Sequence, residues 1–115
     1  MQYLLLIYED EKNWAKMAEA EKGRVISEYG QLTDDLKKSD RYVGGNPLQP
    51  ISTATTVRVR NGNRLTTDGP FAETKEQLGG YYLIEAKDLD EALSLAARVP
   101  AARTGSIEVR PIMKM

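Results

Sequence analysis

The sequence predicts a single α+β domain built around an antiparallel β-sheet. Strand-like and helix-like segments alternate along the chain, with no linker, repeat or low-complexity tract between them. Of the 115 residues, 41% are hydrophobic and 29% are charged, which is ordinary for a globular protein. A chain of this length has room for one domain, 1–115, and not for two.

The first predicted element is a strand over residues 2–8, where apolar and aromatic side chains follow one another almost without a break. Charged residues at 9–11 end the run. A short apolar run bounded by charge is typical of a strand buried on both faces. It lacks a basic flank and is too short for a signal peptide or a membrane span, so a cytoplasmic location without membrane contact is the default expectation.

Helix is predicted over residues 13–38, where apolar residues recur at spacings of three and four. We expect Gly23 to divide a short helix, about 12–19, from a longer second one, because Gly costs about 1 kcal/mol relative to Ala inside a helix. Trp14 is expected to pack in the core.

A hairpin is predicted in the middle of the chain. Residues 41–49 form a strand or an extended arm broken by Gly and Pro. In 54–60, valines alternate with Thr and Arg, so the two kinds of side chain face opposite ways. Asn-Gly-Asn at 61–63 is a turn that tolerates positive φ, and 64–67 return as a short strand.

The last third of the chain predicts a loop, a strand, a helix and a strand. Residues 68–80 are expected to form an ordered loop of about thirteen residues, which is long for a connection within a compact domain. Residues 81–86 are a strand, again apolar on both faces. Asp88 is the expected N-cap of a helix that Pro100 ends, and 105–112 form the final strand.

This order of elements is the split βαββαβ pattern of a ferredoxin-like antiparallel sheet, with an added hairpin. Two helices can cover only one face of such a sheet, yet residues 3–8 and 81–84 are apolar on both faces. A second copy of the chain is the simplest cover, so we expect a homodimer in which two sheets close into a barrel-like sandwich. A monomer whose long loops fold over the sheet is the competing account.

Composition excludes several function classes. The formal net charge is −1, with 16 basic and 17 acidic residues interspersed, so no basic field favours nucleic acid. The chain has no Cys and no His, which removes thiolate chemistry and the commonest base and metal ligand near neutral pH. It also has no Gly-rich phosphate loop and no cluster with metal-ligand spacing, so we expect neither cofactor nor metal.

The loop carries the clearest motif. Residues 68–71 read Asp-Gly-Pro-Phe, followed by Glu-Thr-Lys-Glu at 73–76 and Gly-Gly-Tyr-Tyr at 79–82. This resembles the DGPF motif, which names a branch of the YCII-related protein family. The resemblance covers nearly the whole chain, including 54–60 and 88–92.

The resemblance implies a dimeric α/β-barrel fold and an active-site cleft at which the family's Asp is Asp68. It also implies a regulatory link, since members are often encoded beside extracytoplasmic-function sigma factors. Founding members are associated with acid–base chemistry through a His–Asp pair. Such a pair cannot exist in a chain without His.

The candidate site residues follow from these features. Asp68 is the candidate catalytic residue, as a base or an orienter of water. Candidate binding residues offer a positive charge, a hydroxyl, an aromatic face or close backbone approach; they are Tyr8, Arg58, Phe71, Thr74, Lys75, Gly79, Gly80 and Tyr82.

Each candidate also has a structural interpretation. Asp-Gly-Pro forms turns, and the side chain of Asp68 would then cap its own turn. Phe71 would anchor the loop in the core, and Gly79-Gly80 would be a bulge before a strand. Lys75 would lie on a solvated helical turn with its acidic neighbours.

Three functions are open. The first is a small, cofactor-independent acid–base enzyme whose cleft between the sheet and loop 68–80 takes an anionic or carbonyl-bearing compound. The second is a non-catalytic ligand-binding, regulatory or protein-interaction module, which the missing His favours. The third is a structural dimer in which the loop is only scaffold.

Overall fold

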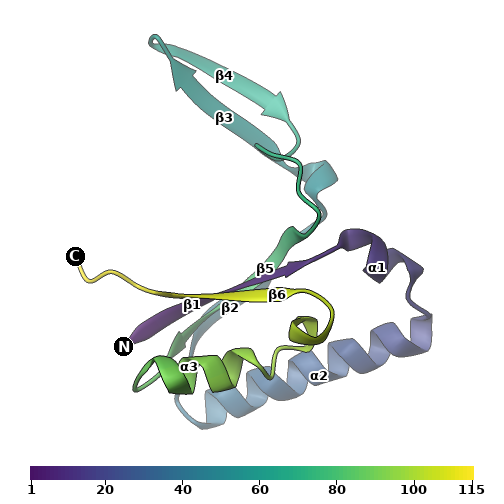
Figure 1. The fold of residues 1–115 in the computed structure, drawn as a ribbon, viewed down its shortest axis with the longest axis vertical. Coiled ribbons are helices and arrows are strands. Elements are labelled where there is room, and N and C mark those ends of the chain that lie inside the picture. Colours follow the sequence, from purple (N-terminus) through teal and green to yellow (C-terminus); the bar gives the residue numbers. More distant parts are fainter.

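The computed structural model describes all residues 1–115, and its body is a four-stranded antiparallel sheet (Figure 1). The strands follow the order β2-β5-β1-β6, which is the order of a ferredoxin-like sheet. Their bounds are β1 (Gln2–Glu9), β2 (Tyr42–Pro47), β5 (Gln77–Glu85) and β6 (Ser106–Pro111). The predicted α+β class and antiparallel sheet are confirmed.

Three α-helices lie on one side of this sheet, α1 (Glu11–Lys16), α2 (Glu19–Lys38) and α3 (Leu89–Ala96) (Figure 1). Acidic N-caps begin two of them. Asp10 accepts a hydrogen bond from the backbone N–H of Lys12 at 3.0 Å, and Asp88 accepts one from that of Glu91 at 2.9 Å. The N-cap predicted at Asp88 is therefore confirmed, and each cap satisfies an amide that the first helical turn leaves free.

The helix division predicted at Gly23 is wrong. The break falls at Met17 and Ala18, whose extended backbones (ψ 141° and 148°) turn the chain from α1 into α2. Gly23 lies inside α2 in open space, where its missing side chain breaks no contact. Trp14 is also not in the core: it is 36% exposed, and the Lys22 ammonium lies 5.7 Å from the centre of its ring.

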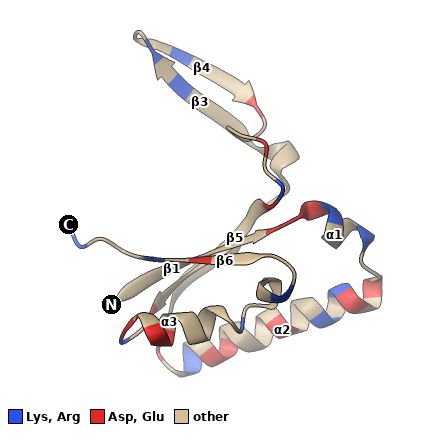
Figure 2. Cartoon of the chain, viewed as in Figure 1, with Lys and Arg blue, Asp and Glu red and all other residues tan.

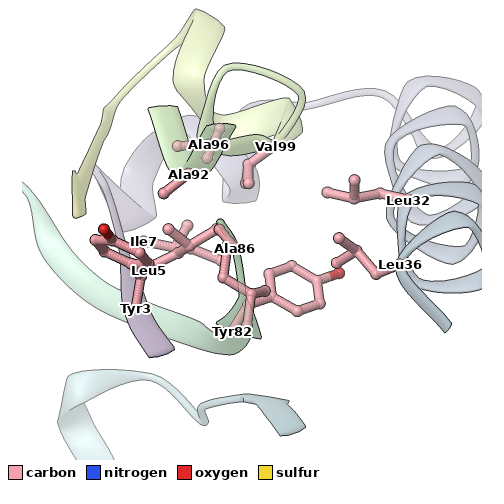
Figure 3. Packing of buried hydrophobic residues seen from close by; sticks show 12 residues of the cluster. Tyr3, Leu5, Ile7, Leu32, Leu36, Tyr82, Ala86, Ala92, Ala96 and Val99 are labelled. Atoms are coloured by element: carbon pink, nitrogen blue, oxygen red, sulfur yellow. The ribbon is translucent and has the colours of Figure 1, made fainter. Parts of the chain in front are cut away.

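The core lies between one face of the sheet and the helices (Figure 3). Alternate residues of β1 and β5 meet side chains from α2 and α3, and Figure 3 shows the Tyr82 ring reaching towards Leu36 on α2. The cluster has twelve buried residues: Tyr3, Leu5, Ile7, Leu32, Leu36, Tyr82, Ile84, Ala86, Ala92, Ala96, Val99 and Ala101. Their burial is the main favourable term in folding, at about 25 cal/mol per Å² of apolar surface.

The first strand was predicted to be buried on both faces, but within one chain it is buried on one face only. Leu4, Leu6 and Tyr8 alternate with the core residues of β1 and are only partly buried, because α2 and α3 cover the opposite face. Leu83 of β5 pairs with Leu4 and is likewise partly buried. The sheet therefore keeps one open face, on which Leu4, Leu6 and Leu83 lie beside the charged Glu108 and Arg110 of β6.

A separate two-stranded sheet stands apart from this body. It consists of β3 (Thr55–Arg60) and β4 (Asn63–Asp68), and it rises on the side of the main sheet away from the helices (Figure 1). Asn61 and Gly62 have φ values of 52° and 76°, which confirms the predicted hairpin turn.

The predicted loop 68–80 is shorter than expected. Asp68 ends β4 and Gln77 begins β5, so the connection is 69–76, and Gly79-Gly80 lie inside a strand. The physical reason is pairing: Gln77 and Leu78 continue the ladder with Glu9 and Tyr8 across an irregularity in register. No helical turn forms around Lys75. Short 3-10 helices, η1 (Ile51–Thr53) and η2 (Pro100–Arg103), complete the fold.

One ion pair joins the beginning of β2 to α3. The Arg41 guanidinium donates two hydrogen bonds to the Glu91 carboxylate, at 2.9 and 2.7 Å, and Glu91 also accepts one from the Lys87 N–H at 3.1 Å. The Arg41 hydrogen bonds are the main reason that the pKa of Glu91 lies below its usual value. The paired carboxylate therefore fixes α3 against the edge strand in its charged form.

We predict that Glu91→Gln lowers the melting temperature at pH 7, and that the difference from wild type narrows at about pH 3. A carboxyl group with a lowered pKa stabilises the fold above its unfolded pKa of about 4.3, and this contribution is lost as pH falls through the folded value. Glu19→Gln is the matched control, because Glu19 pairs with Lys22 in an exposed position. Equal effects of the two substitutions at pH 7 would contradict the assignment.

We also predict opposite effects of Ala at two glycines. Gly23→Ala should stabilise the protein by up to about 1 kcal/mol, because the site is helical and open. Gly105→Ala should destabilise it by about 1–3 kcal/mol, because a Cβ there would overlap the carbonyl oxygen of Tyr8. Urea unfolding of both variants measures this, and a tolerated Gly105→Ala would contradict the close approach of the chain before β6 to the end of β1.

Candidate functional site

A cleft of about 1020 Å³ opens between α1, α2 and the helix-covered side of the sheet. Its apolar walls include Trp14, Met17, Val25, Ile26 and Leu48. It reaches past the edge strand β2 and ends near η2. A space of this size and character is typical of small-molecule sites.

The cleft exists because α2 is longer than the surface it packs on. Its 20 residues span about 30 Å, and only its C-terminal half supplies core residues, Leu32 and Leu36. In the N-terminal half, Val25 stays partly exposed and Ile26 is exposed, although both are apolar. Four of the nine glycines line the cleft: Gly30, Gly45, Gly79 and Gly80.

A hydroxyl cluster lies inside the cleft. Thr33 donates to the Tyr29 carbonyl at 2.9 Å, and its Oγ1 lies 2.8 Å from the Tyr82 hydroxyl. Because the single Thr33 proton is used on the carbonyl, Tyr82 is the donor in the second bond. The Tyr82 oxygen then keeps its acceptor capacity. The Tyr42 ring packs edge-on against Tyr82, with ring centres 6.4 Å apart.

The two cleft phenols are held in their neutral form. Burial raises the pKa of Tyr29 to about 12, against an opposing hydrogen bond from the Ala101 backbone. Burial also raises the pKa of Tyr82. Neutral phenols bind a ligand through hydrogen bonds and do not act as bases near pH 7.

Charged residues also line the cleft. Glu9, Asp10 and Glu11 are acidic, and Lys12 and Arg103 are basic. Glu11 accepts a hydrogen bond from the Ile51 N–H at 3.0 Å, which ties α1 to the segment before the hairpin. Arg103 donates two hydrogen bonds to Glu28, at 2.7 and 2.9 Å. No group of three or more acidic side chains is placed to hold a metal ion.

The structure brings together some of the residues singled out in the sequence and separates others. Gly79, Gly80 and Tyr82 line the cleft. The other candidates lie outside its lining: Tyr8, Arg58, Phe71, Thr74 and Lys75.

The residues outside the cleft have distinct positions. Tyr8 belongs to the open face of the sheet, and Arg58 lies on the hairpin. Phe71 is 78% exposed, so its interpretation as a core anchor is wrong within one chain. The Thr74 hydroxyl donates to the Glu76 carbonyl at 2.6 Å, and Lys75 is exposed.

Asp68 ends β4 and is exposed at the base of the hairpin. Its carboxylate accepts no hydrogen bond, so the interpretation of Asp68 as a turn cap is wrong. The turn is made instead by Gly69, whose φ is +93° and whose N–H donates to the Ala54 carbonyl at 2.7 Å. Asp68 does not line the cleft of its own chain.

Sequence reasoning missed Tyr29, Thr33 and Tyr42 as site residues. Tyr29 lies on the apolar stripe of its helix, and that pattern predicts a core residue. The available signal was the four-residue spacing of Tyr29 and Thr33, which places two hydroxyl-bearing side chains on one helix face.

The whole chain, residues 1–115, matches the model of the YCII-related domain. This chain belongs to the YCII-related family. An uncharacterised protein of Rhizobium meliloti (strain 1021) is 39% identical over 114 residues, covering 97% of this chain and 92% of the relative. None of the helices in this family member has the length and apolar character needed to cross a bilayer.

We predict that Tyr29→Phe reduces the loss of stability at high pH. A tyrosine with a raised pKa stabilises the fold below its unfolded pKa of about 10, and this contribution is lost as pH rises towards the folded value of about 12. Melting temperatures at about pH 9 and about pH 11 measure the loss in each protein. Equal losses in variant and wild type would contradict the burial of the Tyr29 hydroxyl.

Proposed function

We propose that this YCII-related protein is a homodimer that binds a small, mainly apolar molecule in the cleft between α1, α2 and the sheet. The observation that carries the proposal is the cleft itself, about 1020 Å³ in volume, with apolar walls and an interior hydroxyl cluster. Ligand sites commonly combine such walls with a few polar groups that fix orientation.

The chemistry of the lining narrows the ligand class. The neutral Tyr29 phenol can donate to a carbonyl or hydroxyl oxygen of a ligand, and the Tyr82 oxygen, whose proton is used on Thr33, can accept from a ligand hydroxyl. Acidic residues outnumber basic ones in the lining and disfavour an anion by like-charge repulsion. A neutral, oxygen-bearing, largely hydrophobic compound therefore fits better than the anionic substrate that the sequence also allowed.

The homodimer rests on the open face of the sheet. Leu4, Leu6 and Leu83 are partly exposed there, and the same face of a second copy would cover them. The Asp-Gly-Pro-Phe sequence supports assignment of the chain to the DGPF branch of the family.

Acid–base catalysis by Asp68 is a second candidate function, favoured by one observation. The Asp68 carboxylate accepts no hydrogen bond, so the fold does not use it as a turn cap. A carboxylate without a structural partner is available to a substrate or to another chain.

We predict that Asp68→Asn and Asp68→Ala melt within about 2 °C of wild type, because exposed substitutions usually change stability by less than about 0.5 kcal/mol. Differential scanning fluorimetry measures this, with light scattering to follow assembly. A drop of several degrees in both variants would show that Asp68 is scaffold, and would remove its candidacy as a catalytic residue.

Binding in the cleft is tested by filling it. Gly30 lines the cleft and a Cβ there meets nothing within 4 Å, so Gly30→Phe should place a ring in the cleft without disturbing α2. Gly23→Phe is the matched control, in the same helix, equally open and outside the lining. The probe is Nile red, a neutral apolar dye with a carbonyl oxygen, followed by fluorescence.

Wild type and Gly23→Phe should bind the dye, and Gly30→Phe should lose it. Tyr29→Phe should weaken binding by about 2–10-fold, the loss expected for one hydrogen bond to the dye carbonyl. Equal binding by the two Phe variants at position 23 and position 30 would mean that the dye binds elsewhere, and the cleft proposal would fail.

A further inference from the structure

The β3–β4 hairpin is not packed within its own chain. It pairs only with itself, and beyond isolated contacts it touches no helix and no strand of the main sheet. The radius of gyration is 16.1 Å, whereas a compact domain of this length has about 13 Å. A lone two-stranded hairpin is marginally stable in water, so another surface is needed to hold it.

The hairpin carries the side chains that such a surface would cover. Val57 and Val59 are 60% and 62% exposed, on one face of β3. Leu65 on β4 is exposed on the opposite face, where it pairs with Arg58. Two exposed valines on one face of a projecting element mark an interaction site.

The open face of the main sheet is the second uncovered surface. Leu4, Leu6 and Leu83 are partly exposed on it, and the hairpin rises on this same side of the sheet (Figure 1). A molecule docked on the open face would therefore lie beside the hairpin. One partner can cover both surfaces at once.

Charge favours a second copy of this chain as that partner. Between residues 55 and 68 the hairpin has three arginines, Arg58, Arg60 and Arg64, and one acid, Asp68, which gives +2 (Figure 2). Since the whole chain has a net charge of −1, the remaining residues carry −3. The hairpin and the rest of the chain therefore have net charges of opposite sign, which favours the encounter of two copies.

Two-fold symmetry also favours a second copy of this chain as the partner. In a two-fold pair each chain offers one hairpin and one open face and receives one of each, so no apolar surface of either kind is left uncovered. A different protein docked on the sheet would have to supply its own surface that matches both the hairpin and the open face. The self-complementary solution needs nothing beyond this sequence.

We propose that the β3–β4 hairpin is an arm that embraces a second copy of the chain docked on the open sheet face, with Val57 and Val59 as its contact. The proposal rests on the homodimer of the proposed function and goes beyond it, because it assigns the hairpin to the partner. The fold of residues 55–68 then depends on association.

Hydrogen exchange of the wild-type protein tests this dependence. Amides of 55–68 should be protected at concentrations where light scattering shows a dimer, and should exchange at least about tenfold faster after dilution to monomer. Amides of β1 should stay protected in both conditions, since the core lies within one chain. Hairpin protection that does not change on dilution, or a protected hairpin in a monomer, would overturn the proposal.

Substitutions distinguish the contact made by the hairpin from dimerisation through the sheet face. The double variant Val57→Asp, Val59→Asp should raise the dimer dissociation constant by at least about 100-fold, because four charges would enter the two contacts. Leu93→Asp is the matched control: Leu93 is a similarly exposed apolar residue on α3, away from both surfaces, and the dissociation constant should not change.

The outcomes are distinguishable. A double variant that remains as tightly dimeric as wild type overturns the arm but leaves the homodimer standing. A wild-type protein that is monomeric at all concentrations overturns both, and a hairpin that becomes protected only with a different protein overturns the choice of partner. Nile red binding in the cleft is read separately and is unaffected by failure of the arm.

Discussion

The helices that build the core, α2 and α3, both pack on the same face of the four-stranded sheet, and the rest of the structure follows from this constraint. Alternation along β1 places Tyr3, Leu5 and Ile7 in that layer and turns Leu4 and Leu6 to the other side. Only 14 of the 115 residues are buried, so the covered face supplies nearly the whole core. The open face is the consequence of this one-sided arrangement, and the proposed second copy would cover it together with the unpacked hairpin.

The cleft arises from the same layer. The helix α2 extends beyond the surface it covers, so its C-terminal half builds the core and its N-terminal half builds a wall. Tyr82 lies at the boundary, because its ring packs in the core while its hydroxyl bonds to Thr33. Binding and stability are therefore linked through one side chain. The mainly neutral, phenolic interior favours recognition of a ligand over proton transfer by the cleft residues themselves.

The Asp-Gly-Pro-Phe motif lies away from this cleft. Asp68 and Phe71 stand at the base of a projecting hairpin, exposed and outside the cleft of their own chain. Membership of the YCII-related family is established for residues 1–115, and the 39% identical relative is itself uncharacterised. One small chain thus carries two candidate sites: an interior cleft that the fold encloses, and an exposed loop that is free to meet a substrate or a partner.

Local patterns in the sequence were enough to predict the elements that depend on neighbouring residues. The period of apolar residues predicted the strands and α2, Asn61-Gly62 predicted the hairpin turn, and Asp88 predicted the N-cap of α3, because each depends on neighbours in the chain. The tertiary structure alone decided the rest. Pairing with β1 extended β5 back to Gln77, one-sided helix packing left Leu4 partly exposed, and the meeting of α2 with β5 joined Thr33 to Tyr82. These features need contacts between residues far apart in the chain, and a local pattern does not specify which of those contacts form.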